Sequence, residues 1–313
     1  MRTHRAPRVA ALLALVPLLT HCAPGAIPPY APERANAPTR HVVVISIDGL
    51  RADAIEASGA RNLQRMMREG AYSLDARTIM PSRTLPSHTS MITGVSPEVH
   101  GITWNDEQVE AQGRVRVATM FDMADSAHLQ TAAFFAKAKF RHLIHADAPD
   151  EVEAPRGLEI VLAPQMTQNV VHYLRFNEPD LLFVHIPDPD IAGHSTGWMN
   201  TPYRWAVRRA DAAVEQIRRA AVNRFNGDVV VIVTADHGGH GRDHGTDAIE
   251  DVRIPWIAWG NAVQPGELPS GIRTMDTAAT ALWLLGVPVP QRWEGRPVLA
   301  AFRAGAAATT PSP

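Results

Sequence analysis

Five short apolar runs rich in β-branched residues alternate with longer amphipathic segments along the middle of the chain. Apolar residues follow one another along each run instead of alternating with polar ones, which is typical of strands buried on both faces of a mostly parallel sheet. They predict strands at 41–47, 130–135, 180–186, 228–234 and 253–259. The amphipathic segments predict helices at 62–69, 86–93, 163–176, 202–222 and 275–285. The pattern therefore predicts an α/β fold, with a mostly parallel central sheet and helices on both faces.

The N-terminal region has the composition of an export signal. Residues 1–22 begin with three arginines, continue with a short apolar run and end at the only cysteine, Cys22. This order is typical of a secretory signal. The sequence around Cys22 resembles a bacterial lipoprotein box, although His21 stands where a small residue is usual. We therefore expect an exported protein of the periplasm or cell envelope, lipid-anchored through Cys22; the alternative is a signal peptide that is cleaved a few residues later.

Composition indicates the remaining boundaries. Residues 23–40 are rich in proline and alanine and predict an extended tether, residues 41–303 predict one folded domain, and residues 304–313 predict a disordered tail. Charged residues make up 20% of the chain and the formal net charge is −2. Nucleic-acid binding is therefore not indicated. Nothing in the composition indicates an oligomeric state.

Carboxylates and imidazoles follow three of the predicted strands. In chain order the candidates are Asp48, Asp190, His194, Asp236, His237, His240 and His244. Parallel strands bring their carboxyl ends to one edge of a sheet, where α/β proteins bind ligands. Oxygen and nitrogen donors without thiolate suit catalytic zinc and also tolerate manganese. Asp48 alone could cap a helix, and the glycine- and histidine-rich stretch could be a solvated loop, but the convergence of three strand ends favours a metal site.

Thr84 lies just before the helix predicted from Pro86. A hydroxyl at a helix N-terminus faces free backbone N–H groups and the positive end of the helix dipole, which favour a dianionic group and help stabilise an alkoxide. A nearby divalent metal would lower the pKa of the hydroxyl further. Thr84 is therefore a candidate nucleophile, and an ordinary helix N-cap is the compatible alternative.

These segments together resemble the alkaline phosphatase superfamily, and within it the type I phosphodiesterase/nucleotide pyrophosphatase-like family. The matching segments are Ile47-Asp48-Gly49, Thr84-Leu85-Pro86-Ser87-His88, His100-Gly101-Ile102 with Asn105, Pro189-Asp190-Ile191-Ala192-Gly193-His194, and Thr234-Ala235-Asp236-His237-Gly238. The resemblance implies an alkaline-phosphatase-like fold for residues 41–303. It also implies a phosphate-ester hydrolase with two divalent metal ions, Zn²⁺ first and Mn²⁺ or another divalent ion as the alternative.

The resemblance also implies a role for each candidate residue. The implied ligand sets are Asp190, His194 and His244 for one metal, and Asp48, Asp236, His237 and Thr84 for the other. His240 is the alternative to His244. Asn105 is expected to hold a non-bridging phosphate oxygen, with a turn-forming asparagine as the alternative. Thr84 is expected to attack phosphorus, and water then hydrolyses the phosphorylated or nucleotidylated threonine.

The substrate is expected to be a small-molecule phosphate ester or a nucleotide, with diesters and pyrophosphates ranked before monoesters. The segment Ala136-Lys137-Ala138-Lys139-Phe140 departs from the family, whose phosphodiesterase branch has Trp-Pro-Gly at the nucleotide pocket. Lys137 and Lys139 could bind an anionic group of the substrate or could be solvated. The same motifs would also suit a phosphomonoesterase or phosphonate hydrolase of the superfamily, a sulfatase, which a threonine at position 84 disfavours, or a catalytically idle surface binding protein.

Overall fold

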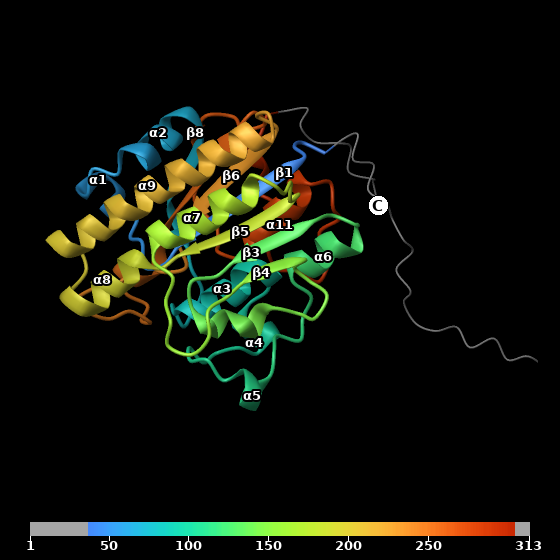
Figure 1. Ribbon diagram of the computed structural model, residues 1–313. Helices are drawn as coiled ribbons and strands as arrows, with labels where there is room; N and C mark the ends of the chain where they lie inside the picture. The colour runs from blue at the N-terminus through green and yellow to red at the C-terminus, as the bar shows by residue number, and fades with distance from the viewer. Residues whose placement is uncertain (1–36, 304–313) are drawn as a thin grey trace, which may run out of the picture. The chain divides into compact units, whose positions relative to one another are not determined.

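The computed structural model describes residues 37–303. Within them eight strands form one sheet, in the spatial order β4-β3-β5-β1-β6-β7-β2-β8 (Figure 1). The bounds are β1 His41–Ile47, β2 Ala71–Arg77, β3 Thr131–Phe134, β4 Glu151–Glu153, β5 Leu181–Ile186, β6 Val229–Thr234, β7 Arg253–Gly260 and β8 Gly266–Glu267. The predicted signal at 1–22, most of the tether at 23–40 and the tail at 304–313 lie outside the described residues, so export and the lipid anchor at Cys22 stay predictions.

The sheet is mostly parallel, as predicted. Strands β4, β3, β5, β1 and β6 run parallel to one another, whereas β7 runs antiparallel to β6 and to β2. All six residues of β5 and of β6 are buried, which explains why their sequences are almost entirely apolar. Strand β2 alternates buried and more exposed positions instead. It was not predicted, because its sequence has no continuous apolar run.

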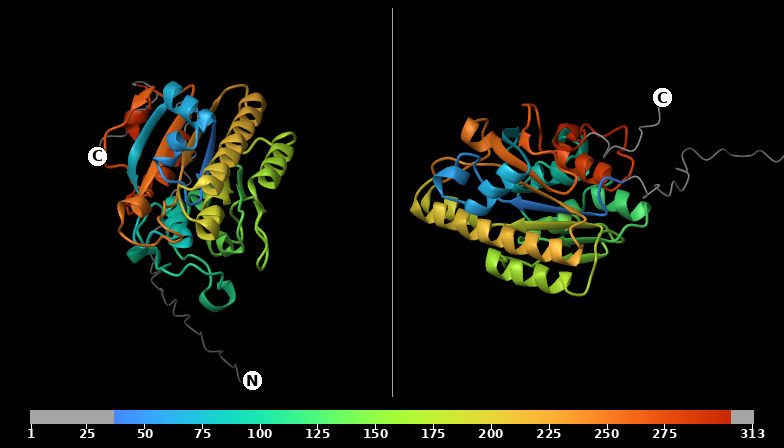
Figure 2. Two further views of the ribbon diagram at one scale, coloured as in Figure 1. Left: turned by 90° about the vertical axis from the view of Figure 1, so that its left-hand side faces the viewer. Right: turned by 90° about the horizontal axis from the view of Figure 1, so that it is seen from above.

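Helices pack on both faces of the sheet (Figure 2). Helix α9 contacts β1 and β6 and lies beside α7. Helices α3, α6 and α11 contact one another, and α11 packs against β1. The bounds are α1 Ala54–Ala57, α2 Arg61–Glu69, α3 Thr84–Thr93, α4 Pro97–His100, α5 Val109–Gln112, α6 Met120–Ser126, α7 Ala163–Leu174, α8 Asp188–Thr196, α9 Thr201–Arg224, α10 Ile249–Val252 and α11 Asp276–Leu284, with 3-10 turns η2 Ala138–Leu143 and η3 Leu299–Ala301. The five predicted helices are therefore present. None of the helices within residues 37–303 has both the length and the apolar character that a membrane span requires.

Helix α9 also holds the loop that follows β1. Its N-cap, Asn200, accepts the backbone N–H of Tyr203 through its side chain. The buried Tyr203 hydroxyl then donates to the carbonyl of Gly49 at 2.9 Å and accepts the N–H of Arg51 at 3.1 Å. The backbone beside Asp48 is thus tied to the longest helix of the described chain.

Candidate active site

The ends of three adjacent strands supply the polar groups of the site. Asp48 follows β1 directly, Asp236 and His237 follow β6, and α8 after β5 carries Asp190 and His194. Because β5, β1 and β6 are neighbours and parallel, these residues meet at one edge of the sheet. Asp190 and His194 are four residues apart on a helix, which places them on the same face.

Helix α8 was not predicted, although Asp190 and His194 on it were identified as candidate ligands. Its sequence, Asp-Pro-Asp-Ile-Ala-Gly-His-Ser-Thr, contains a proline in the first turn and a glycine, and it has no apolar stripe. Proline is tolerated in the first turn, but without amphipathic periodicity a helix cannot be recognised from the sequence.

Gly49 allows β1 and α8 to approach each other closely. Its φ is +70°, in the left-handed region, and a Cβ there would lie 2.9 Å from the Cα of Asp190. The backbone N–H of Asp190 donates to the carbonyl of Asp48 at 3.0 Å. A residue with a side chain at position 49 would therefore separate the two aspartates.

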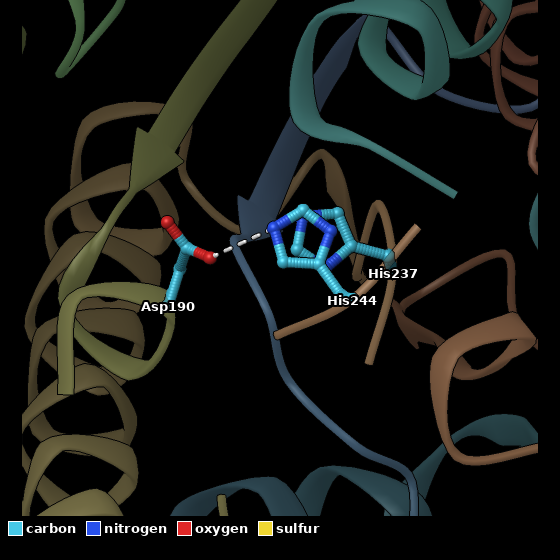
Figure 3. A group of neighbouring side chains, drawn as sticks. All are labelled: Asp190, His237 and His244. Carbon is cyan, nitrogen blue, oxygen red and sulfur yellow. Dashed lines mark ion pairs between the residues drawn. The ribbon is translucent and has the colours of Figure 1, made fainter. Parts of the chain in front are cut away.

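The first group consists of Asp190, His194 and His244. His194 Nε2 lies 3.3 Å and His244 Nε2 lies 3.6 Å from Asp190 Oδ1, and the two Nε2 atoms are 3.1 Å apart. Figure 3 shows the Asp190 carboxylate pointing toward the ring of His244. His240 is exposed, and its Nδ1 lies 2.7 Å from Asp251 Oδ1 instead. The geometry therefore brings His244, and not His240, to Asp190.

The second group consists of Asp48, Asp236 and His237, all fully buried. His237 Nε2 lies 3.3 Å from Asp48 Oδ1 and 3.2 Å from Asp236 Oδ2. The ring of His237 stacks on that of His244 with centroids 3.7 Å apart (Figure 3). The two groups are therefore in direct contact.

The three imidazoles all present the same nitrogen to the carboxylates. The Nδ1 atoms of His194, His237 and His244 lie 2.8–3.0 Å from the backbone carbonyls of Arg242, Gly238 and Ser82, respectively. A carbonyl only accepts, so each Nδ1 carries the hydrogen, and in a neutral ring each Nε2 has its lone pair directed at the carboxylates. Carbonyl partners of this kind are typical of metal-binding histidines.

Two carboxylate oxygens also indicate a cation site. Among residues 37–303, Asp190 Oδ1 and Asp236 Oδ2 are buried side-chain atoms with no hydrogen-bond donor. An unpaired buried carboxylate oxygen is costly unless a cation neutralises it. Lone pairs and unpaired oxygens that face one another fit two divalent cations, one at each group.

The charged groups of the site shift one another's pKa values. Burial opposes a charged ring, but Asp236 and Asp48 outweigh it and raise the pKa of His237 to about 9. Burial and the neighbouring His237 lower the pKa of His244 to about 4. Burial alone would raise the pKa of Asp48, but Lys137 and two histidines hold it well below the usual range. Asp48 is thus ionised at neutral pH and attracts positive charge.

Thr84 is the first residue of α3, as its expected place at a helix N-terminus requires. The N-cap position belongs to Arg83, and no side chain caps the helix, so the alternative in which Thr84 is the N-cap is wrong. Its hydroxyl oxygen instead lies 3.3 Å from His237 Nε2 and 3.5 Å from Asp48 Oδ1. Thr84 therefore adjoins the second group of metal-ligand candidates.

Asn105 and Thr84 both line a cavity of about 340 Å³. Its Oδ1 accepts the backbone N–H of Leu85 at 2.9 Å, a bond to α3 rather than within a local turn. Because the oxygen is used in this way, the NH₂ end of the amide is available as a donor. The arrangement suits the expected contact with a phosphate oxygen.

Lys137 has a role that the sequence did not reveal. It is buried, and its Nζ lies 2.6 Å from Asp48 Oδ2 and 2.6 Å from Asp190 Oδ2. The interpretation of this lysine as solvated is therefore wrong. His185, inside β5, was also missed: its Nε2 lies 3.1 Å from Asp48 Oδ2. An ionisable residue within an otherwise apolar strand was the only sequence signal for it.

Comparison with known proteins adds to this geometry. Rat (Rattus norvegicus) ectonucleotide pyrophosphatase/phosphodiesterase family member 3 is 23% identical over 240 residues, which cover 71% of this chain and 27% of the relative. Human GPI ethanolamine phosphate transferase 1 is 24% identical over 297 residues, which cover 83% of this chain and 30% of the relative. The chain thus spans less than a third of the length of these curated relatives.

A solved structure of murine ectonucleotide pyrophosphatase/phosphodiesterase 5, an inactive form in complex with AMP, matches with a TM-score of 0.69 at 15% identity, covering 82% of this chain and 97% of that one. This likeness shows the fold, which is alkaline-phosphatase-like. The family model described as type I phosphodiesterase / nucleotide pyrophosphatase matches residues 42–253, a segment that includes the ends of β1, β5 and β6. The chain therefore belongs to the type I phosphodiesterase / nucleotide pyrophosphatase family of the alkaline phosphatase superfamily.

Proposed function

We propose that this protein hydrolyses phosphoric esters, with phosphodiesters and nucleotide pyrophosphates as its preferred substrates. Thr84 is the nucleophile, and two divalent metal ions, Zn²⁺ by preference, assist it. The observation that carries the proposal is the arrangement of ring-nitrogen lone pairs and unpaired carboxylate oxygens within reach of the Thr84 hydroxyl. Family membership and the AMP complex of the murine neighbour support a nucleotide or another small phosphate ester as substrate.

The two groups of residues would each hold one metal. Asp190, His194 and His244 offer one oxygen and two nitrogens, and Asp48, Asp236 and His237 offer two oxygens and one nitrogen. Three protein donors with a further position for substrate are typical of catalytic zinc, and such ions polarise phosphoryl oxygens and lower the pKa of a neighbouring hydroxyl.

The residues of the chain perform the remaining tasks. The Thr84 hydroxyl lies 3.5 Å from Asp48 Oδ1 and 3.3 Å from His237 Nε2, so a metal held by these two residues would lower the pKa of the hydroxyl and allow its proton to leave to water. The Thr84 oxygen then forms a bond to phosphorus while the leaving alcohol or phosphate departs, and water later cleaves the Thr84 ester. Asn105, oriented by Leu85 N–H, donates from its amide to a non-bridging oxygen as charge develops there.

The organic part of the substrate would lie in the cavity beside Thr84. Lys139, Leu158 and Ile160 line it together with Asn105, and Leu158 and Ile160 are exposed there. Asp106, Glu107 and Glu159 line the same cavity, so an anionic part of the substrate would have to lie near Lys139 and away from these carboxylates. In this proposal Lys139 binds the anionic part.

A transferase is the second candidate, because a GPI ethanolamine phosphate transferase is among the relatives. Such an enzyme would pass the group on Thr84 to an alcohol instead of water. Adding glycerol or ethanolamine during turnover and analysing the products by mass spectrometry separates the two. Free phosphate monoester as the main product supports a hydrolase, and a new diester with the added alcohol supports a transferase.

The proposed reaction is tested with protein that has been treated with a chelator and reloaded with zinc. We expect no turnover of bis-p-nitrophenyl phosphate after chelation, recovery with zinc, and a higher kcat/KM for this diester than for p-nitrophenyl phosphate. A preference for the monoester would replace the diesterase assignment with a phosphomonoesterase. No turnover of any phosphate ester after loading with zinc or manganese would contradict the proposal and favour a binding protein.

A further inference from the structure

The carboxylates at the site use their two oxygens differently, and Asp236 shows this most simply. Its Oδ1 accepts the backbone N–H groups of Gly49 at 3.1 Å and His237 at 2.9 Å. Its Oδ2 receives no hydrogen bond and lies 3.2 Å from the Nε2 of His237. One oxygen is therefore occupied by protein donors, and the other is directed toward the metal-ligand candidates.

The same division holds for Asp48 and Asp190, and Lys137 creates it at both aspartates, together with His185 at Asp48. The Oδ1 atoms of both aspartates face imidazole nitrogens, at 3.3 Å from His237 and from His194, respectively. Both Oδ2 atoms lie 2.6 Å from Lys137 Nζ. One ammonium group thus occupies the second oxygen of a carboxylate from each of the two metal groups.

Lys137 reaches this position because of the strand order. It follows β3, which is the neighbour of β5, which in turn is the neighbour of β1. The ends of these three adjacent strands carry Lys137, Asp190 and Asp48. The lysine is 9% exposed, so water does not compete well for its ammonium group, and two ionised partners hold it in place.

An aspartate that has one oxygen occupied can bind a metal only through the other. Each group then offers three donors, which suits a four-coordinate zinc ion with one open position. Manganese and calcium prefer more oxygen ligands, which carboxylates supply most easily by binding through both oxygens.

We propose that Lys137 restricts Asp48 and Asp190 to one metal-binding oxygen each, and so makes both sites select zinc over manganese. Lys137 is a positioning residue here, because it acts through the two aspartates. The inference rests on the two-metal site proposed above and identifies what sets its metal preference.

The test is a competition titration of the chelator-treated full chain with zinc and manganese, at one pH, against a fluorescent chelator. Both ions carry the same charge, so loss of a nearby ammonium group changes their affinities in parallel, whereas the freed Oδ2 of Asp190 favours manganese; Asp48 Oδ2 keeps its contact with His185. We expect Lys137→Met to lower the ratio of zinc to manganese affinity by about tenfold or more. The neighbouring Lys139→Met is the matched control, because its lysine makes no bond to either aspartate, and it should leave the ratio unchanged.

An unchanged or higher ratio in Lys137→Met, or an equal fall in Lys139→Met, would overturn the inference. If wild-type protein binds neither ion, the two-metal site itself is wrong, which is a different result. A crystal structure of zinc-loaded wild-type protein tests the same point even if Lys137→Met fails to fold. It should show one oxygen of each aspartate on zinc and the other on Lys137, and zinc bound through both oxygens of either aspartate would contradict the inference.

Discussion

The carboxylates at the active-site edge and those on helix α9 are similarly buried but have different partners. Glu215 on α9 accepts bonds from Arg65 and Arg218, at 2.6–3.1 Å, and also contacts Arg219. Asp211 on the same helix accepts the backbone N–H of Leu63 at 2.7 Å and the side chain of Asn62. At the active-site edge, Asp190 and Asp236 each keep one buried oxygen without a donor.

This difference separates a structural role from a functional one. Asp211 accepts N–H groups in the first turn of α2, whose own N-cap residue, Ala60, has no capping side-chain bond, so it stabilises that helix. Buried oxygens without a donor, such as those of Asp190 and Asp236, cost free energy unless a cation neutralises them. Substitutions at the active-site edge should therefore reduce metal binding and activity, whereas substitutions on α9 should reduce stability and leave activity unchanged.

The largest effect is expected at Thr84. Thr84→Ala removes the nucleophile and should reduce kcat/KM on bis-p-nitrophenyl phosphate by at least about a thousandfold. The metal ligands remain, so zinc binding should persist, and Asp211→Asn, as the control from α9, should retain activity. Turnover near the wild-type rate in Thr84→Ala would show that another group, or water, attacks phosphorus.

Zinc should stabilise the active-site edge against unfolding. At free zinc about 100 times the dissociation constant, each site should add about 2.7 kcal/mol to the free energy of unfolding. Asp236→Asn replaces the carboxylate oxygen that lies 3.2 Å from His237 Nε2 by an NH₂ group, which has no lone pair to offer a metal. This variant should therefore lose the increase in unfolding free energy that zinc gives at one of the two sites. Urea unfolding with and without zinc measures both effects, and a full zinc gain in Asp236→Asn would contradict the ligand assignment.

On α9, replacing an aspartate by asparagine should lower stability whether or not zinc is present. Asp211→Asn places an NH₂ group against the N–H donors of Asn62 and should lower the free energy of unfolding by about 1–3 kcal/mol. The loss should be the same with chelator and with zinc, because no metal is involved. A loss that zinc reverses would break the distinction between the two regions.

The smallest effect is expected in how the unfolding free energy depends on pH through Glu215. Burial opposes its ionisation, but Arg218 and its neighbours lower the pKa of Glu215 to about 2. A lowered pKa means that the ionised group contributes stability at neutral pH and loses it as pH falls from the unfolded value, about 4.3, toward 2. Wild type and Glu215→Gln should therefore differ in unfolding free energy at pH 7 and converge near pH 2. A difference that grows on acidification would contradict this.

The sequence predicted those parts of the site that lie next to an apolar strand. Asp48, Asp236 and His237 follow β1 and β6 directly, so strand and ligand were recognised together. The choice of His244 over His240 depended on family resemblance, because both lie in one glycine-rich segment and only the fold brings His244 to Asp190. The contacts of Lys137 depend on β3 lying beside β5, a long-range pairing that local sequence does not encode.

The zinc content of chelator-treated and reloaded wild-type protein, measured by mass spectrometry of the metal, shows whether the two groups of donors each hold a metal ion. Two groups of three donors predict two zinc ions per chain, with one remaining in Asp190→Ala. A chain that holds no zinc, or that hydrolyses phosphodiesters at the full rate without a metal, would contradict the account.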